Sequence, residues 1–105
     1  MEIVETSVFT RQIKGLLKDD DYKELQARLV ANPWAGAVIR GSGGLRKIRW
    51  AIEGRGKSGG IRVIYYYVVP DDRLFMLAAY SKGAKEDLTG REVAALRKLV
   101  KEELG

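Results

Sequence analysis

The segment Leu45–Tyr67, LRKIRWAIEGRGKSGGIRVIYYY, decides the fold because it joins two strand-like runs through a basic, glycine-rich loop. Successive side chains of a strand point to opposite faces of its sheet. Lys47 and Arg49 therefore share one face, and the apolar residues Ile48 and Trp50 share the other. Long, positively charged side chains beside a basic loop could bind a polyanion. Charged side chains also protect edge strands from aggregation, which is the alternative explanation.

Arg62 does not fit the edge-strand explanation. It stands within Ile61–Val69, a run that is otherwise apolar on both faces and therefore predicts a central strand. A cation in such a strand needs a partner or a ligand, because burial without one is costly. The planar guanidinium group can hold two phosphate oxygens at once, which makes Arg62 a candidate phosphate ligand.

Composition narrows the possible chemistry. The chain has 105 residues, a net charge of +5, no histidine and no cysteine. A structural zinc site, a catalytic triad and a two-histidine phosphodiesterase mechanism are excluded, so catalysis would use Lys, Arg, Tyr, Asp, Glu or Ser. The basic balance favours nucleic acid or an acidic protein as partner. One acid, Glu53, accompanies the cations of the central region, which are Arg40, Arg46, Lys47, Arg49, Arg55, Lys57 and Arg62.

The length predicts one domain over residues 1–105. The sequence shows no secretory signal and no membrane-spanning stretch, which predicts a cytoplasmic protein without a membrane partner. Apolar periodicity predicts a strand at 2–6, helices at 7–17 and 21–31, strands at 45–52, 61–69 and 74–80, and a helix at 89–104. The order β-α-α-β-β-β-α predicts the α+β class, an antiparallel sheet with an N-terminal helical hairpin and a C-terminal helix.

Three residues are predicted to begin the helices. Ser7 and Asp21 suit N-caps of the first two, and Thr89 forms a capping box with Glu92 at the start of the last. Trp34 and Trp50 are expected in the core. Most of the tyrosines are expected there too, although Tyr65, Tyr66, Tyr67 and Tyr80 could also stack on bases.

Two further groups of cations have two possible explanations each. Arg55 and Lys57 lie in the loop 53–60, which is either a solvated hairpin tip or a basic finger that grips phosphates. Lys82 and Lys85 follow the third long strand. They belong either to a solvated loop or to the second wall of a cleft.

Four segments carry a likeness to a known family. They are Asn32-Pro33, GGLRKIR at 43–49, GGIRVIYY at 59–66 and YSKGAKEDL at 80–88. With the element order, they make the chain resemble the RelE/ParE superfamily of bacterial type II toxins over essentially its whole length. The resemblance is greatest to the HigB-like, RelE-related branch.

The resemblance implies a ribosome-dependent mRNA endonuclease (an mRNA interferase) that cuts in the ribosomal A site by attack of the RNA 2′-OH, without metal or cofactor. It implies that Arg62 and Arg49 clamp the phosphate. Lys47 is then the candidate base and Lys82 the candidate acid, and their roles can be exchanged; a lysine whose pKa is lowered by neighbouring cations can act as a base. Further contacts to substrate or ribosome are expected from Arg46, Arg55, Lys57, Tyr80 and Lys85. Leu88 stands where several relatives carry Tyr or His. Of the catalytic roles, that of the general acid is therefore the one that the resemblance supports least.

The resemblance also implies partners. These are the ribosome, mRNA and an antitoxin with a helix-turn-helix domain, similar to HigA, while the free toxin is expected to be a monomer. Two alternatives stay open: a ParE-like inhibitor of DNA gyrase, and an RNA-binding domain without catalysis. ParE-like chains generally lack the strand cations, so Lys47, Arg49 and Arg62 favour RNA cleavage.

Overall fold

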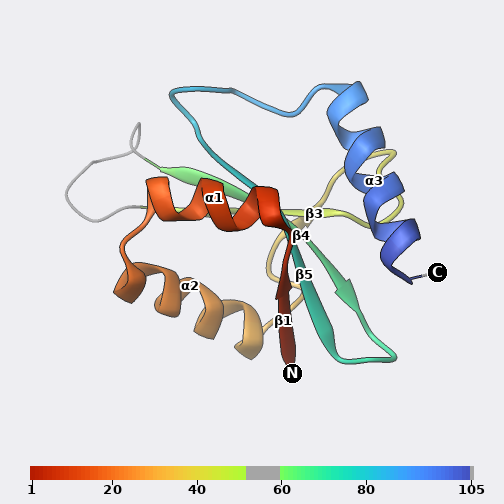
Figure 1. The fold of residues 1–105 in the computed structure, drawn as a ribbon, viewed down its shortest axis with the longest axis horizontal. Coiled ribbons are helices and arrows are strands. Elements are labelled where there is room, and N and C mark those ends of the chain that lie inside the picture. Colours follow the sequence, from red (N-terminus) through yellow and green to blue (C-terminus); the bar gives the residue numbers. More distant parts are fainter. Residues whose placement is uncertain (52–59, 105) are drawn as a thin grey trace.

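The computed structural model describes residues 1–51 and 60–104 (Figure 1). The described elements are β1 (Glu2–Glu5), α1 (Ser7–Leu16), α2 (Asp19–Ala31), β2 (Ala37–Val38), β3 (Arg46–Trp50), β4 (Ile61–Val68), β5 (Arg73–Ser81) and α3 (Gly90–Leu104). Within this part of the chain, no helix is long and apolar enough to cross a membrane.

The strands form one sheet in the order β1-β5-β4-β3-β2, so β4 is the middle strand, as predicted. Three of the four pairings are antiparallel, whereas β1 runs parallel to β5. The expectation of a wholly antiparallel sheet is therefore wrong at this edge. Two helices and three strands separate β1 from β5 in the chain. A connection of this length allows the two strands to pair in parallel, which a short hairpin turn does not.

Helices cover both faces of the sheet (Figure 1). The hairpin of α1 and α2 packs on one face, where its buried residues meet Ile48, Val63 and Tyr65. The helix α3 packs on the other face, where Val100 meets Leu45 and Ile64. Each face has its own apolar core, which explains why β4 is apolar on both sides.

An irregularity in β5 determines which side chains face α3. The register between β4 and β5 shifts between Ile64 and Tyr65, so that Leu77 has no partner on β4. Leu77 and Ala78 both belong to the core on the α3 face, and the next residue, Ala79, returns to the opposite core. The shift is a β-bulge, which places Tyr80 on the α3 face.

Several local predictions are corrected. The N-cap of α1 is Thr6 rather than Ser7, since the Thr6 hydroxyl accepts a hydrogen bond from the Phe9 N–H at 3.0 Å. The helix α2 begins at Asp19, earlier than expected, and its N-cap Lys18 makes no side-chain capping bond. Trp34 is 53% exposed rather than buried, and its ring packs against the half-buried side chain of Arg46.

The predicted capping box at the start of α3 is confirmed. The Thr89 N–H donates to Glu92 Oε1 at 2.9 Å, and the Glu92 N–H donates to the Thr89 hydroxyl at 3.1 Å. The two-residue strand β2 was not predicted, because two residues show no periodicity.

Candidate active site

The pairing of β3, β4 and β5 brings three polar side chains into a row. Arg49 lies directly opposite Arg62, and Arg62 lies directly opposite Tyr80. Residues directly opposite on neighbouring antiparallel strands share a face, with Cβ atoms about 4.5–5.5 Å apart. The row therefore crosses three strands on the face that packs against α3.

Arg62 is 8% exposed, which confirms its predicted place in a buried strand. Its Nη1 atom donates to the Ile61 carbonyl oxygen at 3.3 Å, and no carboxylate within residues 1–51 and 60–104 lies within ion-pairing distance. A buried cation without a counter-charge is costly, and like charges directly opposite on a sheet repel. Locally unfavourable arrangements of this kind are typical of functional sites, and this one suits an anionic ligand.

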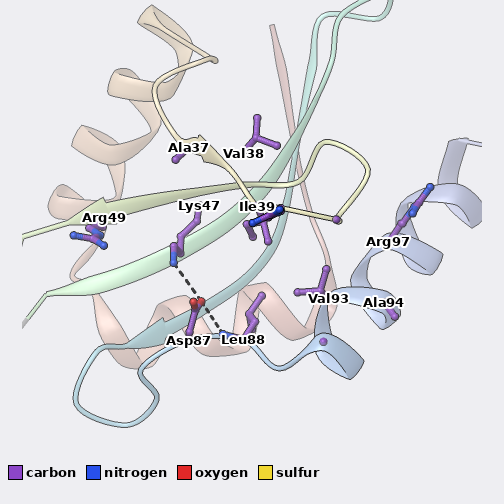
Figure 2. Close-up of a pocket in the computed structure, with 13 residues that line it drawn as sticks. Ala37, Val38, Ile39, Lys47, Arg49, Asp87, Leu88, Val93, Ala94 and Arg97 are labelled. Carbon is purple, nitrogen blue, oxygen red and sulfur yellow. Dashed lines mark hydrogen bonds and ion pairs between the residues drawn. The ribbon is translucent and has the colours of Figure 1, made fainter.

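Lys47 lies on the same face of β3 as Arg49 and points toward the segment before α3 (Figure 2). Its Nζ atom is 3.2 Å from Asp87 Oδ1, which also accepts the Leu88 N–H at 2.9 Å. The Leu88 N–H, followed by the hydrogen bond from Lys47, lowers the pKa of Asp87 below its ordinary value. Asp87 is therefore a carboxylate, which accepts a hydrogen bond from Lys47.

These side chains surround an open hollow of about 510 Å³, which we call the basic hollow. It is lined by Lys47, Arg49, Arg62, Lys82, Glu86 and Asp87. Lys82 belongs to the segment after β5, and its backbone N–H donates to the Gly60 carbonyl oxygen at 3.1 Å. The structure thus brings together the four residues that the sequence suggested as catalytic.

Arg46 does not reach the basic hollow, because it lies on the opposite face of β3. Its Nη1 atom donates to the carbonyl oxygens of Trp34 and Gly36 at 3.2 and 2.6 Å, and its guanidinium lies 5.0 Å from the centre of the Trp34 ring. These contacts hold the segment between α2 and β2 against the sheet, so the structure gives Arg46 a structural position.

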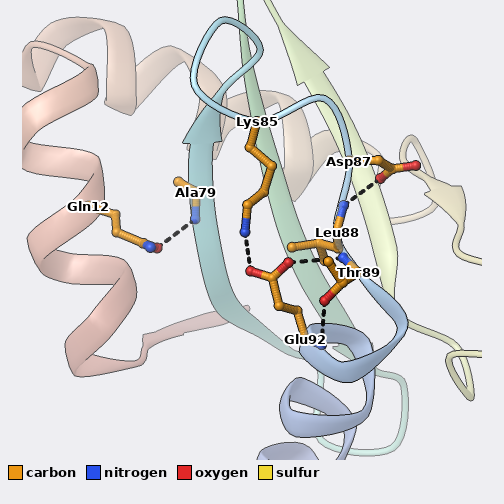
Figure 3. A network of polar contacts seen from close by, with 7 residues as sticks. All are labelled: Gln12, Ala79, Lys85, Asp87, Leu88, Thr89 and Glu92. Carbon is orange, nitrogen blue, oxygen red and sulfur yellow. Dashed lines mark hydrogen bonds and ion pairs between the residues drawn. The ribbon is translucent and has the colours of Figure 1, made fainter.

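Lys85 is also directed away from the basic hollow. It forms an ion pair with Glu92 in the first turn of α3, where Glu92 belongs to the capping box (Figure 3). Lys85 therefore attaches the segment between β5 and α3 to the start of that helix. The attached segment also contains Asp87, whose carboxylate contacts Lys47.

Tyr80 lies in the row beside Arg62, but it does not line the basic hollow. Its hydroxyl is buried and has no hydrogen-bond partner within the described residues. Burial, followed by the charge of Asp87, raises the pKa of Tyr80 above its ordinary value. The tyrosine therefore packs beside Arg62 against the core of the α3 face as a neutral group. Arg55 and Lys57, the remaining candidates, lie outside the described residues.

A second depression, which we call the α3 groove, adjoins the basic hollow. It measures about 630 Å³, lies between the β2 segment and α3, and shares Lys47, Arg49 and Asp87 with the hollow. Its other charged residues, Arg40 and Arg97, were not among the candidates chosen from the sequence. No periodicity or motif connects Arg97 of a helix with cations on a distant strand, so only the fold brings them together.

The arrangement can hold a phosphate group between guanidinium groups and can supply ammonium groups for proton transfer. These features define a small α+β protein with a basic hollow lined by β3, β4 and the segment after β5. The chain matches the model of the RelE toxin of the RelE/RelB toxin–antitoxin system over residues 1–105, and it belongs to this family.

A solved structure supports the fold. The E. coli toxin RelE, as a mutant in the free state, superposes with a TM-score of 0.56 and 18% sequence identity, covering 94% of this chain and 95% of that chain. The predicted α+β class and the predicted RelE/ParE superfamily are thus confirmed. The protein is a toxin of a toxin–antitoxin system, which implies an antitoxin as its partner.

Proposed function

We propose that the protein is a ribosome-dependent mRNA endonuclease that enters the A site and cleaves mRNA there, as a cytoplasmic inhibitor of translation. One observation carries the proposal: Arg49 and Arg62 lie directly opposite each other, with Lys47 and Lys82 around the same hollow. Membership of the RelE family supports it. A gyrase inhibitor would have no evident need for this cluster.

The proposed reaction needs only RNA and protein groups. The 2′-OH beside the scissile bond gives its proton to a base and attacks the phosphorus in line. The O2′–P bond forms, the P–O5′ bond breaks, and the 5′-oxygen takes up a proton, leaving a cyclic phosphate and a 5′-hydroxyl. Arg62 and Arg49 bind the phosphate oxygens, whose negative charge grows in the transition state.

Lys47 and Lys82 are the candidates for proton transfer. Lys47 donates a hydrogen bond to Asp87. Because a neighbouring carboxylate favours the charged form of an amine, this contact supports the assignment in which Lys47 protonates the leaving 5′-oxygen and Lys82 is the base. The reverse assignment requires Lys47 to lose its proton beside a carboxylate, which is less favourable.

The proposal extends to the partners. We infer that Arg55 and Lys57 contact ribosomal RNA rather than the scissile phosphate, so charge reversal there would weaken ribosome binding without abolishing the site. We propose that the toxin belongs to the HigB-like branch and is a monomer when free. Its antitoxin would resemble HigA, with a helix-turn-helix domain, and would neutralise the toxin by covering the basic hollow or by blocking its entry into the ribosome.

The test is cleavage in a translating extract, with mRNA ends mapped by primer extension and the same mRNA without ribosomes as reference. We expect cuts inside the reading frame only when ribosomes are present. Arg62→Ala should slow cleavage by roughly a hundredfold or more, because it removes a donor to the developing charge. Arg11→Ala changes an exposed cation on α1, on the other side of the sheet, and should cleave like the wild type.

Intact mRNA with unaffected translation would contradict the proposal and direct attention to DNA gyrase. RNA binding without cleavage would instead identify a non-catalytic domain. Full cleavage by Arg62→Ala would leave the endonuclease in place but remove Arg62 from the mechanism.

A further inference from the structure

The α3 groove adjoins the basic hollow. The two depressions share Lys47, Arg49 and Asp87 among their lining residues, so a chain bound in one lies next to the other. Figure 2 shows Arg49 at one side of the groove and Arg97 of α3 at the other, with Lys47 between them. A polymer with regularly repeated negative charges fits such a row of cations.

The charges of the groove are available to a ligand. Within residues 1–51 and 60–104, Arg40 and Arg97 have no carboxylate within ion-pairing distance, and the acid that lines the groove, Asp87, is engaged by Lys47. Arg97 lies against Gly43, where a Cβ atom would come within 2.7 Å of its Nε atom. Gly43 has a φ of +75°, so this position favours glycine, which leaves room for the Arg97 side chain.

The groove also has an apolar part. Val38 of β2 is 55% exposed, and it lines the groove together with Ile39, Leu88 and Val93. Apolar side chains between cations are suited to a nucleobase, whose flat face packs on them while its phosphate meets a cation.

We propose that the α3 groove binds the RNA nucleotide that adjoins the cleaved linkage. Its phosphate contacts Arg97, with Arg40 nearby, and its base packs against Val38 and Val93. This inference rests on the proposed function, and it assigns to α3 a part in holding the substrate. The position next to the basic hollow and the excess of positive charge favour RNA over a peptide as the occupant.

The experiment pairs a change in the protein with a change in the RNA. Programmed ribosomes receive mRNA that carries one neutral methylphosphonate linkage, placed in turn on either side of the cleaved linkage. The readout is kcat/KM for cleavage by the wild type and by Arg97→Gln. Lys98→Gln is the matched control, because Lys98 is the next residue on α3, is exposed and does not line the groove.

We expect the wild type to lose roughly tenfold in rate when one flanking linkage is neutral, and Arg97→Gln to lose roughly tenfold on natural mRNA, the size of one charge-assisted contact. The two changes together should cause no further loss, since each removes the same contact. Lys98→Gln should behave like the wild type. Ala94→Leu adds bulk to an exposed position in the groove and should slow cleavage of natural mRNA as well.

Equal rates for Arg97→Gln and Lys98→Gln would overturn the inference while leaving the endonuclease intact. Losses that multiply would also overturn it, because phosphate and arginine would then act independently. An Arg97→Gln protein that cleaves normally but binds its antitoxin weakly would show a protein interface instead. A wild type that leaves mRNA intact would overturn the proposed function itself, which is a separate result.

Discussion

At the scale of single residues, Arg46 and Arg49 show how alternation along one strand divides similar side chains between different tasks. Arg49 faces Arg62 in the basic hollow, whereas Arg46 binds two carbonyl oxygens on the opposite face. The sequence already indicates this division, because Arg46 and Ile48 stand at alternate positions of the strand and therefore share its apolar face. That position conflicts with the expectation that Arg46 contacts the substrate.

We predict opposite effects for substitutions at these two positions. Arg46→Ala should lower the free energy of unfolding by about 1 kcal/mol, since it removes two partly exposed hydrogen bonds and the contact with the Trp34 ring, and should leave cleavage unchanged. Arg49→Ala should retain stability, because it removes a repulsion, and should lower cleavage by about a hundredfold. Urea unfolding and the ribosome cleavage assay measure the two effects. A loss of activity without loss of stability in Arg46→Ala would return Arg46 to the substrate site.

Other residues of the site could not be found by such reasoning. Lys47, Arg49 and Arg62 lie on neighbouring strands, and their alternation and sequence context predicted a shared surface. Asp87 and Arg97 join that surface only because α3 and the segment before it fold back across the sheet. Their sequence neighbourhoods, an acidic turn and an amphipathic helix, are those of ordinary solvated positions.

At the scale of elements, the long strands and all three described helices were predictable, because each shows a clear period or cap. The start of α3 is the best example, since Thr89 and Glu92 form the capping box that their spacing predicts. The short strand β2 and the bulge in β5 were not predictable, because both depend on a neighbouring strand rather than on local preference.

Glu92 connects α3 to a dependence of stability on pH. The hydrogen bond from Lys85, followed by the Thr89 N–H, lowers the pKa of Glu92 from 4.5 to about 2 in the folded protein. A lowered carboxylate pKa stabilises the fold above the unfolded pKa, and this stabilisation is lost as pH falls through the interval between the two values. We predict that the melting temperature of the wild type falls more steeply than that of Glu92→Gln between these pH values.

Circular dichroism during thermal unfolding at a series of pH values measures the difference. Glu24→Gln is a suitable control, because Glu24 is an exposed acid on α2. Parallel curves for the wild type and Glu92→Gln would show that the ion pair with Lys85 does not couple to folding.

At the scale of the whole molecule, cations from several elements gather around two neighbouring depressions. The basic hollow and the α3 groove together bring Arg40, Lys47, Arg49, Arg62, Lys82 and Arg97 to the α3 face of the sheet. Such a distribution orients a protein toward a polyanion and accelerates their association.

We predict that ribosome binding weakens steeply with added salt, since bound cations on RNA are released when the protein binds. Lys82→Gln should lower the slope of log Kd against log salt concentration by about one, because it removes one phosphate contact. Lys23→Gln, a matched change of an exposed residue on α2, should leave the slope unchanged. A titration of labelled toxin with ribosomes at several salt concentrations provides the slopes. Equal slopes for the wild type and Lys82→Gln would remove Lys82 from the contact.

The parallel pairing of β1 with β5 has a consequence for biosynthesis. The Thr6 hydroxyl after β1 donates to the Leu77 carbonyl oxygen, 71 positions later in the chain. During translation the first strand therefore emerges without its partner, and Lys82 and Asp87 follow later still. A nascent toxin consequently has an incomplete sheet and an incomplete basic hollow until Asp87 has been made. If the protein is the proposed ribosome-dependent endonuclease, the order of synthesis delays its activity during its own translation.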